Sequence, residues 1–310
     1  MAFAPVALGV PPSTRPFAVN RLYAGTIFVV HLLALLAFVP AFFSWIGLGA
    51  MVVGIHVFGQ GITIGYHRLL THRSFKTLPW VEHSLAVLGM CCLEDSPARW
   101  VAIHRMHHVH SDEQPDPHSP LVTFLWSHLG WLMVKNRETH SISAIETYAK
   151  DLLRDPFYMW LEKRPQTVLW IGLAQLPCFF LAGVAIGRIG WGPAAAVPLG
   201  ISMVVWGVFV RIVAVWHITW SVNSLSHMFG YRNYETGEGS RNNWLVALLT
   251  VGEGWHNNHH EDPSAASVQH RWWEIDISYY EIRLLEALGL ASDVITPRHI
   301  RRSVTATRPS

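Results

Sequence analysis

Residues 22–66 read LYAGTIFVVHLLALLAFVPAFFSWIGLGAMVVGIHVFGQGITIGY and contain no Asp, Glu, Lys or Arg. A helix needs about 20 predominantly apolar residues to cross a bilayer. This stretch holds two such segments, one from about Leu22 to Phe43 and one from about Trp45 to Tyr66. Because almost nothing separates them, we expect a tight antiparallel hairpin across a membrane.

Two further stretches are long and apolar enough to span, near Thr167 to Gly187 and near Pro193 to Trp216. In the whole chain of 310 residues, 51% are apolar and only 14% are charged, against roughly 25% charged residues in soluble domains. Fifteen tryptophans also fit a protein with membrane interfaces. The fold class predicted is an all-α membrane protein with four transmembrane helices.

The placement of Lys and Arg predicts the orientation in the membrane. Arg15 and Arg21 precede the first span, and the segment between Arg68 and Arg164 is rich in both residues. The hairpin turn has none, and the connection between the third and fourth spans has only Arg188. By the positive-inside rule, both termini and the large central loop lie in the cytoplasm.

The central loop has two apolar stretches that are too short or too polar to span, Trp80–Leu93 and Leu121–Val134. We interpret them as helices lying against the bilayer, in a cytoplasmic cap above the four-helix stem. No repeat or low-complexity linker separates domains, so residues 21–290 are expected to form one domain. Residues 1–20 are expected to be a flexible tail and residues 291–310 a C-terminal tail.

Three polar residues inside the spans are expected to pack in the protein rather than to act chemically: His31, His56 and Arg211. The net charge of +2 is small and no nucleic-acid motif is present, so no nucleic-acid partner is expected.

Nineteen histidines are present, and their spacing matters more than their number. Residues 104–108 and 256–260 both have the pattern H-x-x-H-H, in which a helix places the first histidine near the other two. His67 and His72 are five residues apart, which suits a helix end better than one helical face. A fourth element, residues 223–227 (NSLSH), directly follows the last predicted span.

All four elements are predicted to lie on the cytoplasmic side near the membrane. Adjacent histidines cannot point the same way, so each pair would serve two different metals. Nine histidines exceed what one tetrahedral zinc can hold, and imidazole suits iron, copper, zinc and nickel. We therefore predict a two-metal centre, and nitrogen-rich coordination is compatible with iron that activates O₂. Its predicted ligands are His67, His72, His104, His107, His108, His227, His256, His259 and His260.

The remaining histidines are expected to have packing, second-sphere or surface roles: His83, His110, His128, His140, His217, His270 and His299. His118 follows the second cluster closely and stays ambiguous.

Five segments in this order and spacing resemble the membrane-bound fatty acyl desaturases of the stearoyl-CoA desaturase type, over roughly residues 20–290. They are GITIGYHRLLTHRSFK (61–76), WVAIHRMHHVHSDEQPDPHSP (100–120), SHLGW (127–131), NSLSH (223–227) and GEGWHNNHHEDP (252–263). The resemblance implies that one iron is held by His67, His72, His104, His108 and His259. It implies that the other is held by His107, His227, His256 and His260, with Asn223 acting through a water. The reaction implied is O₂-dependent formation of a cis double bond, expected at the 9-position.

The sequence departs from the animal acyl-CoA members at Ala102 and Ile103, where those members carry an Arg-Asp pair that engages CoA. This departure weakens the case for a CoA-linked substrate and leaves acyl-lipids and acyl-carrier-protein thioesters open. The segment WVAIHRMHH resembles the bacterial and cyanobacterial branch, in which acyl-lipid substrates occur. An acyl-lipid or an acyl-CoA is the expected substrate, and the sequence does not separate the two. Trp220 is a candidate for the substrate channel, although a packing role explains it as well.

Each turnover needs two electrons that O₂ does not supply. The chain has no haem or flavin motif, and its three cysteines form no C-x-x-C pair. A separate electron-transfer protein of ferredoxin or cytochrome type is therefore expected as a partner.

Two other interpretations remain open. A histidine-box hydroxylase of alkanes, sterols or carotenoids would differ only after the first hydrogen abstraction. A histidine-rich metal transporter would place its ligands near the bilayer midplane, whereas these clusters lie outside the predicted spans.

Overall fold

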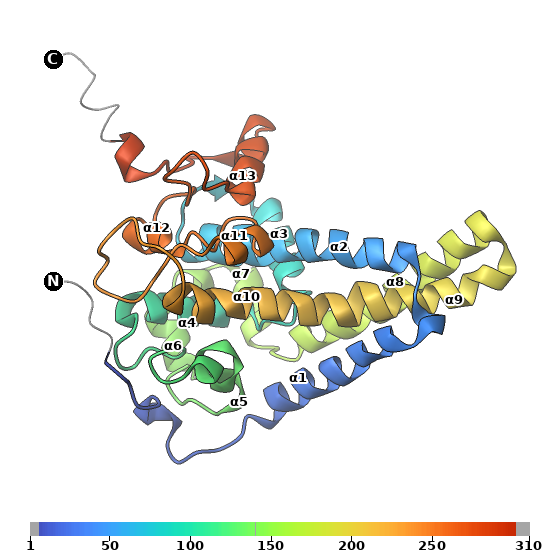
Figure 1. The fold of residues 1–310 in the computed structure, drawn as a ribbon, viewed down its shortest axis with the longest axis horizontal. Coiled ribbons are helices and arrows are strands. Elements are labelled where there is room, and N and C mark those ends of the chain that lie inside the picture. Colours follow the sequence, from blue (N-terminus) through green and yellow to red (C-terminus); the bar gives the residue numbers. More distant parts are fainter. Residues whose placement is uncertain (1–5, 140, 302–310) are drawn as a thin grey trace.

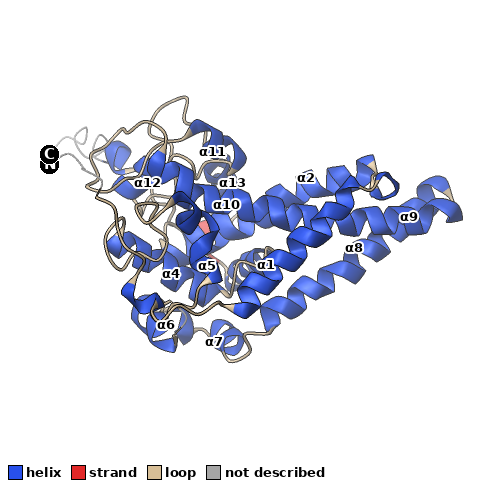
Figure 2. Cartoon of the chain, turned by 60° about the horizontal axis from the view of Figure 1, so that its bottom comes forward, coloured by secondary structure: helices blue, strands red, loops and turns tan. Residues whose placement is uncertain are grey.

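The computed structural model describes residues 6–139 and 141–301, and the regular secondary structure of this part is almost entirely helical (Figures 1 and 2). The helices are α1 (Arg21–Ala34), α2 (Trp45–Gln60), α3 (Pro79–Met90), α4 (Pro97–His110), α5 (Trp131–Met133), α6 (Ile142–Tyr148), α7 (Pro156–Glu162), α8 (Thr167–Trp191), α9 (Pro193–Val204), α10 (Arg211–Met228), α11 (Trp244–Leu249), α12 (His256–Glu261) and α13 (Ile277–Ala287). π-Helical segments cover Gly61–Thr71, Trp126–Gly130 and Val205–Val210, and short 3₁₀ turns cover Pro12–Thr14, Leu35–Phe38, Pro40–Phe42 and Leu152–Arg154. The strands β1 (Lys76–Thr77) and β2 (Ala291–Ser292) pair antiparallel.

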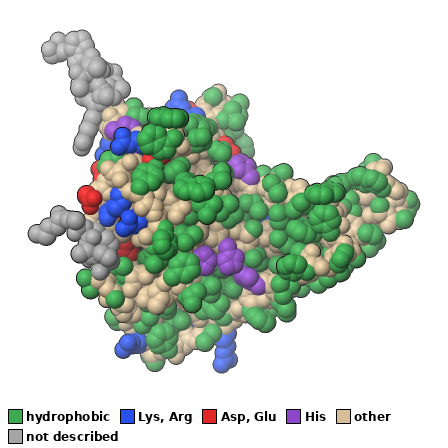
Figure 3. Space-filling model, viewed as in Figure 1, with side chains coloured by type: hydrophobic (Ala, Val, Ile, Leu, Met, Phe, Trp, Pro, Cys, Tyr) green, Lys and Arg blue, Asp and Glu red, His purple; other side chains and the backbone are tan. Residues whose placement is uncertain are grey.

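The molecule consists of a stem and a body (Figure 1). The stem is made by α1, α2, α8, α9 and α10, and the body at one end carries the other labelled helices. Hydrophobic side chains cover the stem, while Lys, Arg, Asp and Glu gather on the body (Figure 3). Such a distribution fits a stem surrounded by lipid and a body exposed to water.

In the described part of the chain, four helices are long and apolar enough to cross a membrane, as predicted: Arg21–Phe38, Trp45–Thr71, Thr167–Trp191 and Pro193–Met228. The second and fourth continue beyond the predicted ends at Tyr66 and Trp216. His67 and the element 223–227 therefore belong to the spanning helices themselves, which corrects the expectation that the latter follows the last span.

The two helical hairpins of the stem depend on local sequence. Ser44 caps α2 by accepting a hydrogen bond from the backbone N–H of Gly47. Gly192 ends α8 with φ 90°, a left-handed conformation that glycine adopts without strain. A Cβ on Gly187 would lie 2.7 Å from the carbonyl oxygen of Ala195, so this glycine allows α8 and α9 to pack closely.

Arg211 faces the interior of the stem, as expected, and is fully buried. Its Nε donates to the carbonyl oxygen of Gly207 at 2.8 Å, and its Nη2 donates to Gln175. The guanidinium also lies over the ring of Phe58, 4.2 Å from the centroid. These contacts compensate the cost of placing a cation within the membrane.

The body packs around a buried cluster that includes Leu69, Met90 and Ile282. Helix α3 packs along the π-helical end of the second span, with Ala86 and Met90 fully buried and Trp80 60% exposed. The second apolar stretch of the central loop, 121–134, forms the short helices around α5.

The described parts of both expected tails are held by hydrogen bonds. The backbone N–H of Leu8 donates to Leu121, and that of Lys135 donates to Ala18. Near the other end, β2 pairs with β1 and the backbone N–H of Ile295 donates to Ser74. Residues 8–20 and 291–301 thus pack against the body.

Candidate metal centre

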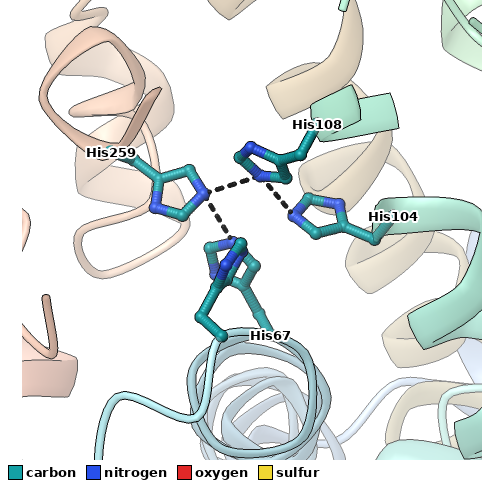
Figure 4. A group of neighbouring side chains, drawn as sticks. His67, His104, His108 and His259 are labelled. Carbon is teal, nitrogen blue, oxygen red and sulfur yellow. Dashed lines mark hydrogen bonds between the residues drawn. The ribbon is translucent and has the colours of Figure 1, made fainter. Parts of the chain in front are cut away.

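Five histidines from three separate elements converge in the body, and Figure 4 labels four of them, His67, His104, His108 and His259. His67 lies in the π-helical end of the second span and His72 follows that segment directly. His104 and His108 lie on α4, and His259 lies on α12. One ligand nitrogen from each lies within 4.8 Å of the others.

The π-helix explains how two histidines five residues apart meet. The backbone N–H of His72 donates to the carbonyl oxygen of His67 at 3.1 Å, the i to i+5 bond that defines this helix. Their ring centroids lie 4.8 Å apart. The pair does lie at a helix end, as predicted, and the wider π turn brings both rings to the same side.

A second group consists of His107 on α4, His227 on α10, and His256 and His260 on α12, again with ligand nitrogens within 4.8 Å. The two adjacent pairs divide between the groups. His107 and His260 belong to the second group, whereas His108 and His259 belong to the first. The nine histidines that the sequence predicts to act together therefore lie together, in the two sets implied by the resemblance.

Carboxylates order several of these imidazoles from behind. The Nδ1 atom of His67 lies 2.9 Å from Glu253. That of His107 lies 3.0 Å from Asp116, and that of His227 lies 3.1 Å from Asp112. A carboxylate at Nδ1 fixes the proton there and leaves the Nε2 lone pair for a metal.

The Nε2 atoms then face one another across a short distance. His259 lies 3.1 Å from His67 and 3.0 Å from His108, and His108 lies 3.1 Å from His104 (Figure 4). In the second group, the corresponding distances from His256 to His227 and to His260 are both 3.1 Å. Lone pairs held so close repel one another unless a cation lies between them, so the donor set fits two metal ions.

Burial favours the neutral form, which binds metal, at six of the nine imidazoles. Desolvation, and after it the charge effect of neighbouring histidines, lowers the pKa well below the ordinary value for His72, His104, His108, His256, His259 and His260. Desolvation also acts to raise the pKa of Glu253, but the charges of Arg68 and His67 overcome it and lower that pKa to about 2. These six ligands are thus neutral, while the Glu253 carboxyl group beside His67 is ionised.

Two cavities meet beside the histidine groups. A cavity of about 140 Å³ is lined by Val52, Ile55, His67, Val215 and His256, among others. A cavity of about 450 Å³ extends from His104 to α1 and the start of α8. The residues that line both cavities are Trp100, His104, Thr219 and Asn223.

Asn223 therefore lies at the junction of the cavities, beside the histidines. Trp220 lines the larger cavity but is also 4% exposed and stacked on Trp216, with centroids 5.6 Å apart. The structure therefore shows Trp220 in aromatic packing and at a cavity wall, and its part in a substrate channel stays a prediction.

The other histidines have polar or aromatic neighbours. His31 contacts His217, and His217 contacts His128, at 3.1 and 2.9 Å between ring nitrogens. His56 contacts Glu281 at 2.6 Å. His118 lies beside His107, with centroids 4.4 Å apart, which places it in the surroundings of the second group.

The other surface and packing histidines also follow the expectation. His83 contacts Asp155, His110 contacts Tyr148, and the ring of His270 lies edge-on to that of His299. His140 lies outside the described residues.

Four carboxylates lie behind the ligands without having been predicted from the sequence: Asp112, Asp116, Glu238 and Glu253. Three of them had a signal, because Asp112, Asp116 and Glu253 lie within nine residues of a histidine box. Glu238 had none, since its contacts to His227 and His260, at 3.6 and 3.7 Å, depend on the fold alone.

Comparison with known proteins agrees with this geometry. The sequence profile described as fatty acid desaturase matches residues 43–287. The sn-1 stearoyl-lipid 9-desaturase of Anabaena variabilis is 41% identical over 290 residues, which cover 91% of this chain and 96% of the relative. The sn-2 palmitoyl-lipid 9-desaturase of Nostoc sp. (strain 36) is 43% identical over 270 residues, covering 86% and 87%. An acyl-CoA 5-desaturase of Anemone leveillei is 38% identical over 274 residues, covering 88% and 78%. The chain belongs to the fatty acid desaturase family.

Proposed function

We propose that this protein is an integral membrane oxidoreductase that uses O₂ to introduce a cis double bond at the 9-position of a saturated acyl chain carried by a membrane lipid. The observation that carries the proposal is the position of the two histidine groups at the junction of two cavities. Relatives named stearoyl-lipid and palmitoyl-lipid 9-desaturases, aligned over most of the chain, support the substrate class and the position.

The cofactor proposed is a pair of iron atoms. One would be held by His67, His72, His104, His108 and His259, and the other by His107, His227, His256 and His260, with Asn223 acting through a water. When bound, the iron pair supplies the O₂-dependent oxidation that an unactivated methylene requires, because such a carbon offers neither acidity nor a leaving group. The overall reaction consumes O₂, two electrons and two protons, and releases two water molecules.

The residues of the chain position the substrate and the ligands. An acyl chain that occupies both cavities must pass Trp100, Thr219 and Asn223, which brings one pair of adjacent methylenes beside the histidines. Val52, Ile55 and Val215 supply an apolar wall that excludes water from the far part of the chain. Meanwhile Glu253 and Asp116 hold protons at Nδ1 of His67 and His107 and so keep the Nε2 atoms directed inward.

The substrate proposed is an acyl-lipid rather than an acyl-CoA. Ala102 and Ile103 are 1% and 8% exposed, and Ile103 lines the larger cavity with an apolar side chain. Neither side chain can bind a phosphate or an adenine by hydrogen bonds. The similar proteins include both acyl-lipid and acyl-CoA desaturases, so the two substrate classes must be compared directly with this enzyme.

We further propose that residues 21–290 form a single domain whose body is a cytoplasmic cap, with both termini in the cytoplasm. The Lys and Arg distribution supports this orientation, and the charged surface of the body is consistent with it. Electrons would come from a separate protein of ferredoxin or cytochrome type.

The test is expression of the full chain in a host whose own acyl-lipid desaturases have been deleted, followed by lipid profiling. We expect new lipids with a cis double bond at carbon 9, located by mass spectrometry. A hydroxylated lipid without a new double bond would identify a hydroxylase instead. Metal uptake by vesicles without O₂ consumption would favour a transporter, although the histidine groups lie in the body rather than midway along the stem.

A further inference from the structure

The larger cavity is not lined by hydrocarbon alone. Leu22, Ile27 and Leu169 form apolar parts of its wall, but Glu94, Arg99 and Trp131 also line it. An acyl chain offers nothing to which these polar groups can bond. Their presence distinguishes this cavity from the smaller one, whose far wall is formed by residues such as Val52 and Ile55.

Several polar atoms of this wall are buried without a hydrogen-bond partner in the described structure. They are Oε1 of Glu94, Nε of Arg99, Nδ1 of His118 and Nε1 of Trp131, and all four residues line the same cavity. His118 is only 3% exposed. A buried polar group left without a partner is costly, so four such groups around one cavity indicate a ligand with polar atoms of its own.

The chemistry of two of these groups restricts the ligand. The Nε–H of Arg99 and the indole N–H of Trp131 can only donate hydrogen bonds. The ligand must therefore supply acceptors, and the acceptors nearest to an acyl chain are the oxygens at its carboxyl end. The carboxyl end belongs in the larger cavity and the methyl end in the smaller one.

The charges around Arg99 argue against a polyanionic carrier such as CoA. Its Nε lies 4.0 Å from Asp95 and its Nη2 lies 3.9 Å from Glu162, while the Tyr23 hydroxyl donates to Asp95. One cation flanked by carboxyl groups leaves no excess positive charge for phosphates. Burial raises the pKa of Glu94 to about 8, so at neutral pH its carboxyl group is protonated and offers an O–H donor.

The position of the cavity fits entry from the membrane. Leu22 on α1 and Leu169 on α8 line it and are 64% and 41% exposed, so the cavity reaches the apolar flank of the stem. Arg99 precedes His104 by five residues on α4, about 7.5 Å along the helix. Carbons 1 and 9 of an extended acyl chain are separated by eight C–C bonds, or about 10 Å if each bond advances as in an extended polypeptide backbone. This length suits an ester near Arg99 and carbon 9 near His104.

We propose that Arg99 and Trp131 bind the ester oxygens of an intact neutral glycerolipid that enters sideways between α1 and α8. Asp95 and Glu162 hold the Arg99 guanidinium at the cavity wall. This inference rests on the proposed desaturase function and adds the residues that recognise the head of the substrate.

The test measures equilibrium binding to the purified, iron-loaded full chain, with radiolabelled 1,2-distearoylglycerol as the probe. Octadecane is the matched probe that keeps the hydrocarbon and lacks the oxygens, and stearoyl-CoA is the third probe. The variants are Arg99→Met and Trp131→Phe. The controls are Arg164→Met and Trp160→Phe. The guanidinium carbon of Arg164 lies 4.9 Å from the centroid of the Trp160 ring, and neither residue lines the cavity.

We expect each cavity variant to weaken binding of distearoylglycerol about tenfold, in line with the loss of one buried hydrogen bond, and to leave octadecane binding unchanged. KM for the lipid should rise while the iron content stays at the wild-type value, and Arg99→Lys should recover part of the affinity. The controls should bind both probes as the wild type does.

Three results would overturn the inference. Equal weakening of octadecane binding would show that the side chains only pack, and unchanged binding of distearoylglycerol would show that they do not contact the ester. Tighter wild-type binding of stearoyl-CoA than of distearoylglycerol would assign the cavity to a CoA carrier. If the wild type desaturates its substrate and the cavity variants bind distearoylglycerol as the wild type does, this inference alone is refuted. If the wild type has no desaturase activity, the proposed function is refuted.

Discussion

At the scale of single residues, the centre depends on pairs in which a carboxylate orders a histidine. Glu253 illustrates the arrangement, because it contacts Nδ1 of His67 and also pairs with Arg68 at 2.8 Å. Arg68 in turn pairs with Asp276 at 2.9 Å. A chain of charges therefore runs from a metal-facing imidazole into the interior of the body, and each link can be tested separately.

Glu253→Gln should weaken metal binding while keeping the shape of the side chain. The amide cannot stabilise the imidazole as a carboxylate does, and losing such a partner costs roughly 10- to 100-fold in metal affinity or activity. Iron retention during dialysis against a chelator measures the effect. Glu286→Gln is the control, since Glu286 pairs with Arg283 on α13 away from the centre. Equal iron loss from both variants would show that Glu253 has no special role.

His107→Ala and His260→Ala should each remove desaturase activity, because both side chains belong to the second histidine group. Helical content by circular dichroism and elution of the detergent complex should stay as in the wild type. His83→Ala is the control, because His83 contacts Asp155 outside the two groups. If either ligand variant forms product at a near-normal rate, its histidine is not an essential ligand.

At the scale of helices, π-helical geometry and interhelix ties position the boxes. Arg105, inside the second histidine box, donates to the carbonyl oxygens of Leu70 and Thr71 and to Asp151. It thereby joins α4 to the end of the second span, and so joins two of the three elements that carry the first histidine group.

Because of the Arg105–Asp151 ion pair, the free energy of unfolding should fall at acidic pH. Desolvation acts to raise the pKa of Asp151, but hydrogen bonds from Arg105 and Arg73 overcome it and lower that pKa to about 2, below the roughly 3.9 of an unfolded chain. A lowered carboxyl pKa stabilises the fold above the unfolded value, and that contribution is lost as the pH falls towards 2. Unfolding midpoints of the wild type and Asp151→Asn in detergent should differ at pH 6 and converge near pH 2. A constant difference across this range would contradict the assignment.

The close packing of α8 and α9 gives a prediction for the stem. Gly187→Ala should destabilise by about 1–3 kcal/mol, the usual cost of overpacking, because the new Cβ would lie 2.7 Å from the Ala195 carbonyl oxygen. Gly190→Ala on the same helix meets nothing within 4 Å and should be neutral or stabilising. Thermal unfolding of both variants in one detergent measures the difference, and equal midpoints would show that the contact is not tight.

The elements also show what the sequence can predict. The four spans follow from apolar length, and the division of His107 from His108 follows from the geometry of adjacent side chains. The continuation of the second span beyond Tyr66, through His67 and Arg68, does not follow from hydropathy. There the helix persists because Arg68 finds Glu253 and Asp276, which lie far away in the sequence.

At the scale of the whole molecule, the two histidine groups lie in the charged body at one end of the apolar stem. The cavities extend from the histidines towards the stem, and one reaches its apolar flank at Leu22 and Leu169. The residues proposed to bind the ester of the lipid could not be identified from the sequence, because only the fold brings them together. Arg99 and Trp131 are far apart in the sequence and belong to no box, yet they line one cavity.

The central claim is that nine histidines hold two iron atoms. The most direct measurement is the metal content of the full chain, purified in detergent from cells supplied with iron and quantified by mass spectrometry with Mössbauer spectroscopy. We expect two iron atoms per chain in a nitrogen-rich, coupled pair. A single metal ion per chain, or zinc in place of iron in an active preparation, would contradict it.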